Sequence, residues 1–252
     1  KAKLNQLNRS DDRRNNLWKP EAGKTRVRIV PYVHRKDNPF LELYFHYDIA
    51  KRSMLSPVSF GNADPVVEFA EKLKKTGDKE DWLMGRKIEP KMRTYVPVIV
   101  RGKEADGVKF WGFGKTIYTE LLSIVSDPDY GDITDLMNGR DIDVEFTPAE
   151  GGGYPKTAIR VKPNTSAATE DKGIAEKIMN QPQITDIFPE PTYEELENAL
   201  KEWMNPENAD SDVETTSNTA TDTNAKSEEK PAAATTEKKT DVASAFNDLF
   251  NQ

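Results

Sequence analysis

The stretch RTYVPVIVRGKEADGVKFWGF, residues 93–113, contains the two apolar runs around which we expect the fold to form. Arg93 to Arg101 and Val108 to Phe113 are rich in valine, isoleucine and aromatic residues, which favour strands. A loop with glycines and charged residues lies between the two runs. The stretch therefore predicts a pair of neighbouring strands joined by a short loop.

The segments on both sides of this pair predict further strands and helices. Strands are expected where apolar residues alternate with polar ones or where aromatics gather, over residues 25–32, 41–49, 141–146 and 157–161. Helices are expected from Asp64-Pro65 to a stop at Gly77, over residues 115–126, and from the capping box at Thr192 to about Met204. These elements predict a mainly β fold with helical insertions, for which an OB-type barrel is one fit among several.

The composition indicates that part of the chain cannot be buried. Of the 252 residues, 36% are hydrophobic and 31% are charged, which is an apolar share below that of an ordinary globular chain. The polar residues after Pro206 predict a disordered acidic linker over 205–240. The last segment, 241–252, is expected to dock on a partner protein through one apolar helix face, with the partner-binding residues Phe246, Leu249 and Phe250.

The net charge of −7 hides a gradient along the chain. Residues 1–36 contain 11 Lys and Arg against 3 Asp and Glu, whereas residues 167–252 contain 7 against 19. A basic front and an acidic end suggest a body that binds a polyanion and a tail that imitates one. We expect a basic arm over residues 1–17 and a folded core over residues 18–204.

The residue types argue against several kinds of chemistry. The chain has no cysteine, so thiolate metal sites are excluded, and His34 and His46 are too few for a multi-histidine site. Asp141, Asp143 and Glu145 share a strand face and could hold Mg²⁺ in a nuclease, although a solvated charged face explains them better. Because no apolar segment is long enough to span a membrane, we expect a soluble, cytosolic protein.

The main functional signal is a run from Trp82 to Lys115 in which aromatic residues are interleaved with cations. Bases of single-stranded nucleic acid stack on aromatic faces, which contributes about 1–3 kcal/mol per base, and the phosphates pair with Lys and Arg. The turn GFGKT, residues 112–116, fails the glycine spacing of a phosphate loop but could still bring backbone N–H groups near a phosphate. With two basic residues upstream, the residues expected to bind DNA are Arg35, Lys36, Trp82, Arg86, Lys87, Lys91, Arg93, Tyr95, Phe110, Trp111, Phe113 and Lys115.

Several motifs together resemble a known family. They are VKFWGFGKTIY (108–118), KMRTYVPVIV (91–100), WKP (18–20), RVRIVP (26–31) and the helix start DPVV (64–67). In this order they resemble the core of the T-even phage helix-destabilising single-stranded DNA-binding proteins. The resemblance spans roughly Trp18 to Met204, and the acidic tail matches in character rather than in letters.

The resemblance implies a non-enzymatic protein with an OB-fold core and a helical subdomain at about residues 55–90. Such a protein coats single strands cooperatively in DNA replication, recombination and repair, in the cytoplasm of the infected bacterial host. The basic arm would serve self-association along the strand. The acidic tail would recruit phage replication proteins such as a polymerase, helicase loader or primase, and would shield the cleft. The resemblance places stacking aromatics at Trp82, Tyr95 and Trp111, with a weaker match at Phe60.

The sequence departs from this family at its zinc site. The best-known relative holds a structural zinc with one histidine and three cysteines. His46 matches the histidine, but Asp64 and Val67 stand at cysteine positions, so we expect no zinc and no other cofactor. The subdomain would be held instead by an apolar set such as Val66, Phe69, Leu73 and Leu55. A single-stranded RNA-binding or translational-repressor module of OB type is an alternative function, because the same stacking surface accepts RNA.

Overall fold

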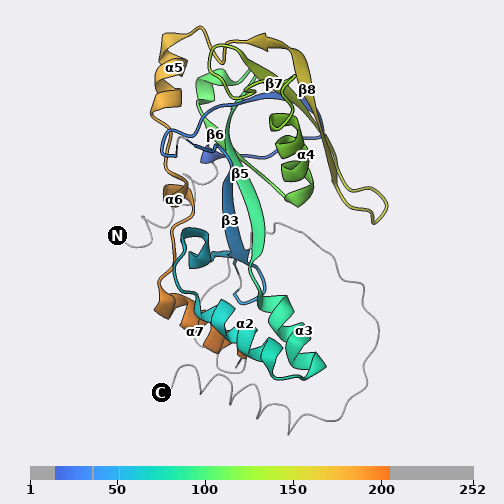
Figure 1. Cartoon of the computed structure of the whole chain (residues 1–252), viewed down its shortest axis with the longest axis vertical. Helices are drawn as coiled ribbons and strands as arrows, with labels where there is room; N and C mark the ends of the chain where they lie inside the picture. The colour runs from blue at the N-terminus through green and yellow to red at the C-terminus, as the bar shows by residue number, and fades with distance from the viewer. Residues whose placement is uncertain (1–14, 36, 51, 205–252) are drawn as a thin grey trace. The chain divides into compact units, whose positions relative to one another are not determined.

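The structure is a computed structural model that describes residues 15–35, 37–50 and 52–204. These residues form two compact units (Figure 1). The first contains the described residues up to Phe45 and residues 91–190, and the second contains those of 46–90 and 191–204. The helical subdomain was expected at about residues 55–90; the second unit begins earlier and also includes a later segment of the chain. Within the described ranges, no helix is long and apolar enough to cross a membrane.

The first unit is built on a mostly antiparallel sheet. Its strands are β1 (Leu17–Trp18), β2 (Gly23–Ile29), β3 (Leu41–His46), β5 (Lys91–Val100), β6 (Lys109–Phe113), β7 (Gly139–Thr147) and β8 (Lys156–Ser166). The order is β1-β6-β5-β2-β7-β8, and β3 pairs with β5 outside this path. The long strand β5 pairs with β3 along residues 91–95, with β6 along 94–98 and with β2 along 98–100. The strand pair predicted from residues 93–113 is confirmed as β5 and β6.

Helix α4 (Lys115–Val125) completes the main hydrophobic core of the first unit. Its buried Ile117 and Leu121 belong to the same cluster as Val96 of β5 and Trp111 of β6. A second, smaller cluster joins Ile178 of α5 (Lys172–Met179) to Ile99 of β5 and to residues next to the ends of other strands. The remaining helices of this unit are the single turns η2 (Glu104–Asp106) and α6 (Ile184–Ile187).

The second unit is mainly helical. Its elements are β4 (Met54–Leu55), the 3₁₀ turn η1 (Pro57–Phe60), α2 (Pro65–Lys75), α3 (Lys79–Ile88) and α7 (Tyr193–Met204). The helices α3 and α7 both pack against α2 (Figure 1). Val66, Phe69 and Leu73 are in the core of this unit, as expected from the sequence. Leu55 is buried too, but its neighbour Met54 is the β4 residue in that core cluster.

Helix α3 was not predicted from the sequence. It begins after Asp78, whose side chain accepts a hydrogen bond from the backbone N–H of Glu80. The middle of the helix contains Gly85, a residue that disfavours helices by about 1 kcal/mol relative to alanine. Glycine is needed there because a Cβ atom at Gly85 would lie only 2.7 Å from the backbone oxygen of Ala70 in α2. The close contact between α2 and α3 therefore explains why α3 contains Gly85, the residue that made the helix hard to recognise from the sequence.

Candidate nucleic-acid interface

Strand register sorts the expected DNA-binding residues of the first unit onto two faces of the sheet. Residues directly opposite each other in an antiparallel pair share a face. Tyr95 lies opposite Gly112, whereas Trp111 and Phe113 lie opposite Val96 and Thr94. Tyr95 and the two β6 aromatics therefore occupy opposite faces of the sheet.

Three aromatic residues of β6 that were expected to bind DNA are buried in the core. Trp111 is only 1% exposed, and Phe110 and Phe113 are buried as well. The ring of Trp111 packs edge-on against Trp18 and Phe113, with centroids 5.6 Å and 4.7 Å apart. Burial of such a side chain stabilises the fold by about 1.5–3 kcal/mol, which is similar to the binding free energy that stacking on one base contributes. These rings have no face free for a base, so we correct their assignment from stacking to core packing.

Tyr95 belongs to an aromatic cluster on the other face of the sheet. Its ring centroid lies 4.9 Å from that of Phe188 and 6.1 Å from that of Phe45. The ring also covers Gly112, where a Cβ atom would come within 2.5 Å of it. Arg93, two residues earlier on the same face, donates from Nη2 to the backbone oxygen of Gly112 at 3.4 Å. Tyr95 is itself mostly buried, so its contact with a base would be limited to an edge.

Phe188 is a half-buried member of this cluster that the sequence did not reveal. It follows the single turn α6 and lies outside the run of aromatics and cations, so no local pattern marks it. The tertiary fold brings it to Tyr95 and Phe45. In this cluster Phe45 and Tyr95 are buried, so Phe188 is its most exposed ring.

Lys115 is exposed at the first position of α4. Gly114 precedes it as the N-cap, and no side chain caps the helix. The first turn contains no acidic residue, so no carboxylate offsets the partial positive charge of the helix start. The structure therefore places a lysine and backbone N–H groups together, in the arrangement expected from the sequence for residues 112–116.

In the second unit, α3 carries an exposed tryptophan beside a cation. The buried side of the helix contains Asp81, Gly85 and Ile88, which leaves Trp82 and Arg86 on the outer side. Trp82 is 43% exposed. The guanidinium carbon of Arg86 lies 5.3 Å from the centre of its ring, at the i,i+4 spacing of one helix face.

Four other residues that were predicted to bind DNA are exposed, two in each unit. Lys87 is exposed on α3, and Phe60 is exposed at the end of η1. In the first unit, Lys91 is exposed at the start of β5. Arg35 is exposed, and its Nε donates to the backbone oxygen of Asn38 at 3.3 Å, so it also stabilises the loop before β3.

Some predictions fall on residues that the structure does not describe. Lys36, the arm up to residue 14, the linker over 205–240 and the peptide with Phe246, Leu249 and Phe250 lie outside the described residues. The expectations for them therefore stay predictions.

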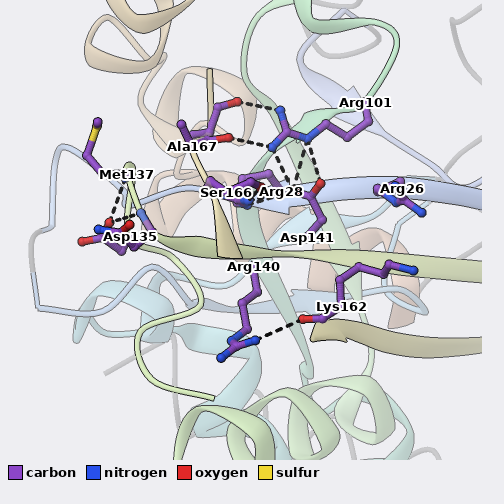
Figure 2. Close-up of polar contacts among 12 residues, drawn as sticks. Arg26, Arg28, Arg101, Asp135, Met137, Arg140, Asp141, Lys162, Ser166 and Ala167 are labelled. Carbon is purple, nitrogen blue, oxygen red and sulfur yellow. Dashed lines mark hydrogen bonds and ion pairs between the residues drawn. The ribbon is translucent and has the colours of Figure 1, made fainter. Parts of the chain in front are cut away.

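Two of the three carboxylates considered for a nuclease, Asp141 and Asp143, form ion pairs with nearby arginines and lysines. Figure 2 shows Arg28 and Arg101 converging on Asp141, whose Oδ1 lies 2.9 Å from the nearest nitrogen of each arginine. Asp143 forms ion pairs with Arg26 and two lysines. Within the described parts of the chain, no group of three or more histidine and carboxylate residues could hold a metal ion.

The sequence contains a signal for these ion pairs that was missed, because the arginines of β2 and the aspartates of β7 have the same spacing. Arg26 and Arg28 alternate on β2 in step with Asp143 and Asp141 on β7, and the register places each arginine opposite its aspartate. Asp143 is almost fully buried, which raises its pKa, but the hydrogen bonds and charges of Arg26 and Lys24 outweigh burial and lower the pKa to about 2.

His46 and Asp64, which the resemblance aligns with zinc ligands, form a closed hydrogen-bonded group with Ser56 in the second unit. His46 lies with Nδ1 3.0 Å from the backbone oxygen of Ile88 and with Nε2 2.9 Å from Oδ2 of Asp64. Ser56 donates to the same carboxylate oxygen. The other oxygen of Asp64 accepts the backbone N–H groups of Val66 and Val67 and so caps α2.

These residues do not fit a zinc ion. Val67 offers no ligand atom, and the polar atoms of His46, Ser56 and Asp64 are already used in contacts with one another and with the backbone. Burial raises the pKa of Asp64, but the hydrogen bonds and charge of His46, with the Ser56 hydroxyl, outweigh it and hold the pKa below its ordinary value. A carboxylate and a histidine therefore stabilise the start of α2 directly.

Comparison with known proteins does not assign the chain to a family. No protein-family model matches it, and no curated protein matches it.

Proposed function

We propose that the protein binds single-stranded DNA without sequence preference and acts as a coating protein rather than an enzyme. The observation that carries this proposal is the exposed Trp82 ring with the Arg86 guanidinium over it on α3. An exposed tryptophan beside a cation supplies both a stacking face for a base and a charge for its phosphate. Lys87 adds a second exposed cation on the same helix.

The first unit would add phosphate contacts. Lys91, Arg93 and Lys115 supply cations, and the half-buried ring of Phe188, which packs on Tyr95, supplies a partly exposed aromatic side chain. We also propose that the sheet of this unit is a barrel of OB type, a fold that often binds single strands. The roles in replication, recombination and repair, the self-associating arm, the protein-recruiting tail and the host cytoplasm rest on the family resemblance alone.

Tryptophan fluorescence during titration with oligo(dT) tests the role of Trp82. Binding of a base to Trp82 should quench part of the emission, so Trp82→Phe should lose most of the quenching that the wild-type protein shows. Trp203→Phe is the matched control, because Trp203 packs against the core of the second unit and should leave the quenching intact. If Trp82→Phe is quenched as strongly as the wild type, Trp82 does not stack on bases. The exposed Trp82 ring then no longer supports the proposed function.

The preference for DNA over RNA needs a separate experiment. A base stacks whether or not its sugar has a 2′-hydroxyl, so the aromatic surface alone does not separate the two. Competition between oligo(dT) and oligo(U) of equal length would do so. We expect DNA to be preferred; a clear preference for oligo(U) would favour the RNA-binding alternative.

A further inference from the structure

Strand register gathers four cations around one buried carboxylate on the sheet of the first unit. Asp143 of β7 lies opposite Arg26 of β2 and opposite Arg160 of β8. Arg26 donates its Nε–H to Oδ1 of Asp143 at 2.8 Å. The Nζ atoms of Lys24 and Lys162 lie 2.9 Å and 3.5 Å from Oδ2. We call Lys24, Arg26, Arg160 and Lys162 the Asp143 cation cluster.

The cations of this cluster reach solvent, whereas the carboxylate does not. The side chain of Asp143 is 3% exposed, while those of Lys24, Arg26 and Lys162 are 56%, 45% and 36% exposed. Arg160 is exposed, and its side chain forms no hydrogen bond or ion pair with another described residue. A single buried carboxylate thus holds cations together without neutralising them all, and the surface above it is positive.

Such a cluster favours a bound anion. Like charges held close together repel each other, and an anion that approaches them from solvent relieves that repulsion. Arginine and lysine form their strongest hydrogen bonds with phosphate and carboxylate oxygens. Asp143 accepts the Nε–H of Arg26, and a guanidinium has further N–H donors for an outside ligand.

The side chains on this face of the sheet suit a DNA duplex better than a single strand. None of the described side chains that the register places on this face of β2, β7 and β8 is aromatic. They are Lys24, Arg26, Arg28, Asp141, Asp143, Glu145, Thr147, Lys156, Ala158 and Arg160, together with Lys162, whose Nζ atom lies near Asp143. A single strand gains affinity when its bases stack on aromatic rings, whereas a duplex hides its bases and presents only phosphates to a flat surface.

We propose that the Asp143 cation cluster binds the phosphates of duplex DNA. This surface goes beyond the proposed single-strand function, because it uses other residues and no stacking. The proposal does not require that the single-strand function be correct.

The test measures binding of the full chain to a 20-base-pair duplex and to (dT)20 by fluorescence anisotropy at several salt concentrations. Arg160→Gln removes one cation of the cluster. This cation forms no hydrogen bond or ion pair through its side chain with another described residue, so its removal breaks no such contact. It should weaken duplex binding about five- to tenfold near 0.1 M salt and lower the log–log salt slope by about one. Arg160→Lys should restore most of the affinity, and (dT)20 binding should not change.

Lys172→Gln is the matched control, because it removes the same charge from an exposed position on α5 of the same unit. It should leave duplex binding unchanged. The proposal is overturned if the wild type does not bind the duplex, or if Arg160→Gln binds it as tightly as Lys172→Gln does. Equal losses on the duplex and on (dT)20 would assign the cluster to a single-strand path instead. If (dT)20 is not bound at all while Arg160→Gln still weakens duplex binding, the cluster stands and the proposed single-strand function fails.

Discussion

Trp82 and Trp111 are the same residue type in opposite environments. Trp82 is 43% exposed on a helix, and Trp111 is 1% exposed in the core of a sheet. Both lie in the run of aromatics and cations that predicts nucleic-acid binding, so the sequence assigns them the same role. Burial separates them, because a ring that packs against Trp18 and Phe113 stabilises the fold and is not available to a base.

This difference predicts opposite consequences for two alanine substitutions. Trp111→Ala should lower the free energy of unfolding by about 3–5 kcal/mol, since it leaves a cavity in the core. Trp82→Ala should change stability by less than about 1 kcal/mol but should weaken binding to oligo(dT) by about 1–3 kcal/mol. Urea denaturation and oligo(dT) titration measure the two effects. A strongly destabilised Trp82→Ala with unchanged affinity would reverse the assignment.

Asp143 gives the first unit a predicted dependence on acid. Its pKa in the folded protein is about 2, below the ordinary value of 3.8, so the unfolded chain takes up the proton first as pH falls. The stabilisation by this carboxylate is therefore complete above about pH 4 and is lost progressively toward pH 2. Urea unfolding at several pH values should show this fall in the wild type.

Asp143→Asn should be less stable than the wild type near pH 7 and should lose less stability between pH 4 and pH 2. Glu145→Gln is a suitable control, because Glu145 is an exposed carboxylate on the same strand. It should follow the wild-type pH dependence. An Asp143→Asn protein with the same acid sensitivity as the wild type would show that the ion pairs around this carboxylate contribute nothing.

At the scale of elements, periodicity predicts most strands but not which way they face. The valine, isoleucine and aromatic content of residues 93–101 and 108–113 correctly indicates β5 and β6. It does not fix their relative register, and a shift of one residue exchanges the two faces. The sequence therefore named Arg93, Tyr95, Trp111 and Phe113 together as DNA-binding residues but could not show that the two pairs lie on opposite faces. Helix α3 was missed for a different reason, since its inward face contains Asp81 and Gly85 beside Ile88 and so lacks a continuous apolar stripe.

The packing of α3 on α2 predicts that Gly85→Ala is destabilising. Alanine favours helices over glycine by about 1 kcal/mol, but its Cβ would lie 2.7 Å from the backbone oxygen of Ala70. The resulting shift should lower the free energy of unfolding by about 1–3 kcal/mol. Lys79→Ala, at an exposed position of the same helix, should change stability by less than about 0.5 kcal/mol. A Gly85→Ala protein as stable as the wild type would mean that the two helices are not in such close contact.

At the scale of the whole molecule, contacts between segments that are far apart in the chain could not be predicted from single motifs. The second unit is interrupted in sequence, because residues 91–190 belong to the first unit and lie between its two parts. The sequence indicated α7 from its capping box but could not show that it packs on α2, since that contact joins residues far apart in the chain. For the same reason Phe188 and the partners of Asp143 emerged only from the fold.

The central claim is that the full chain binds single-stranded DNA through cations and an exposed tryptophan. The most direct measurement is its affinity for oligo(dT) at about 50 mM and 200 mM salt, a range in which phosphate contacts change affinity strongly. Four or five contacts from residues such as Arg86, Lys87, Lys91, Arg93 and Lys115 predict a log–log slope of about −3. Saturable binding with a slope of this size supports the account. No binding at the lower salt concentration, or an affinity that does not change with salt, would contradict it.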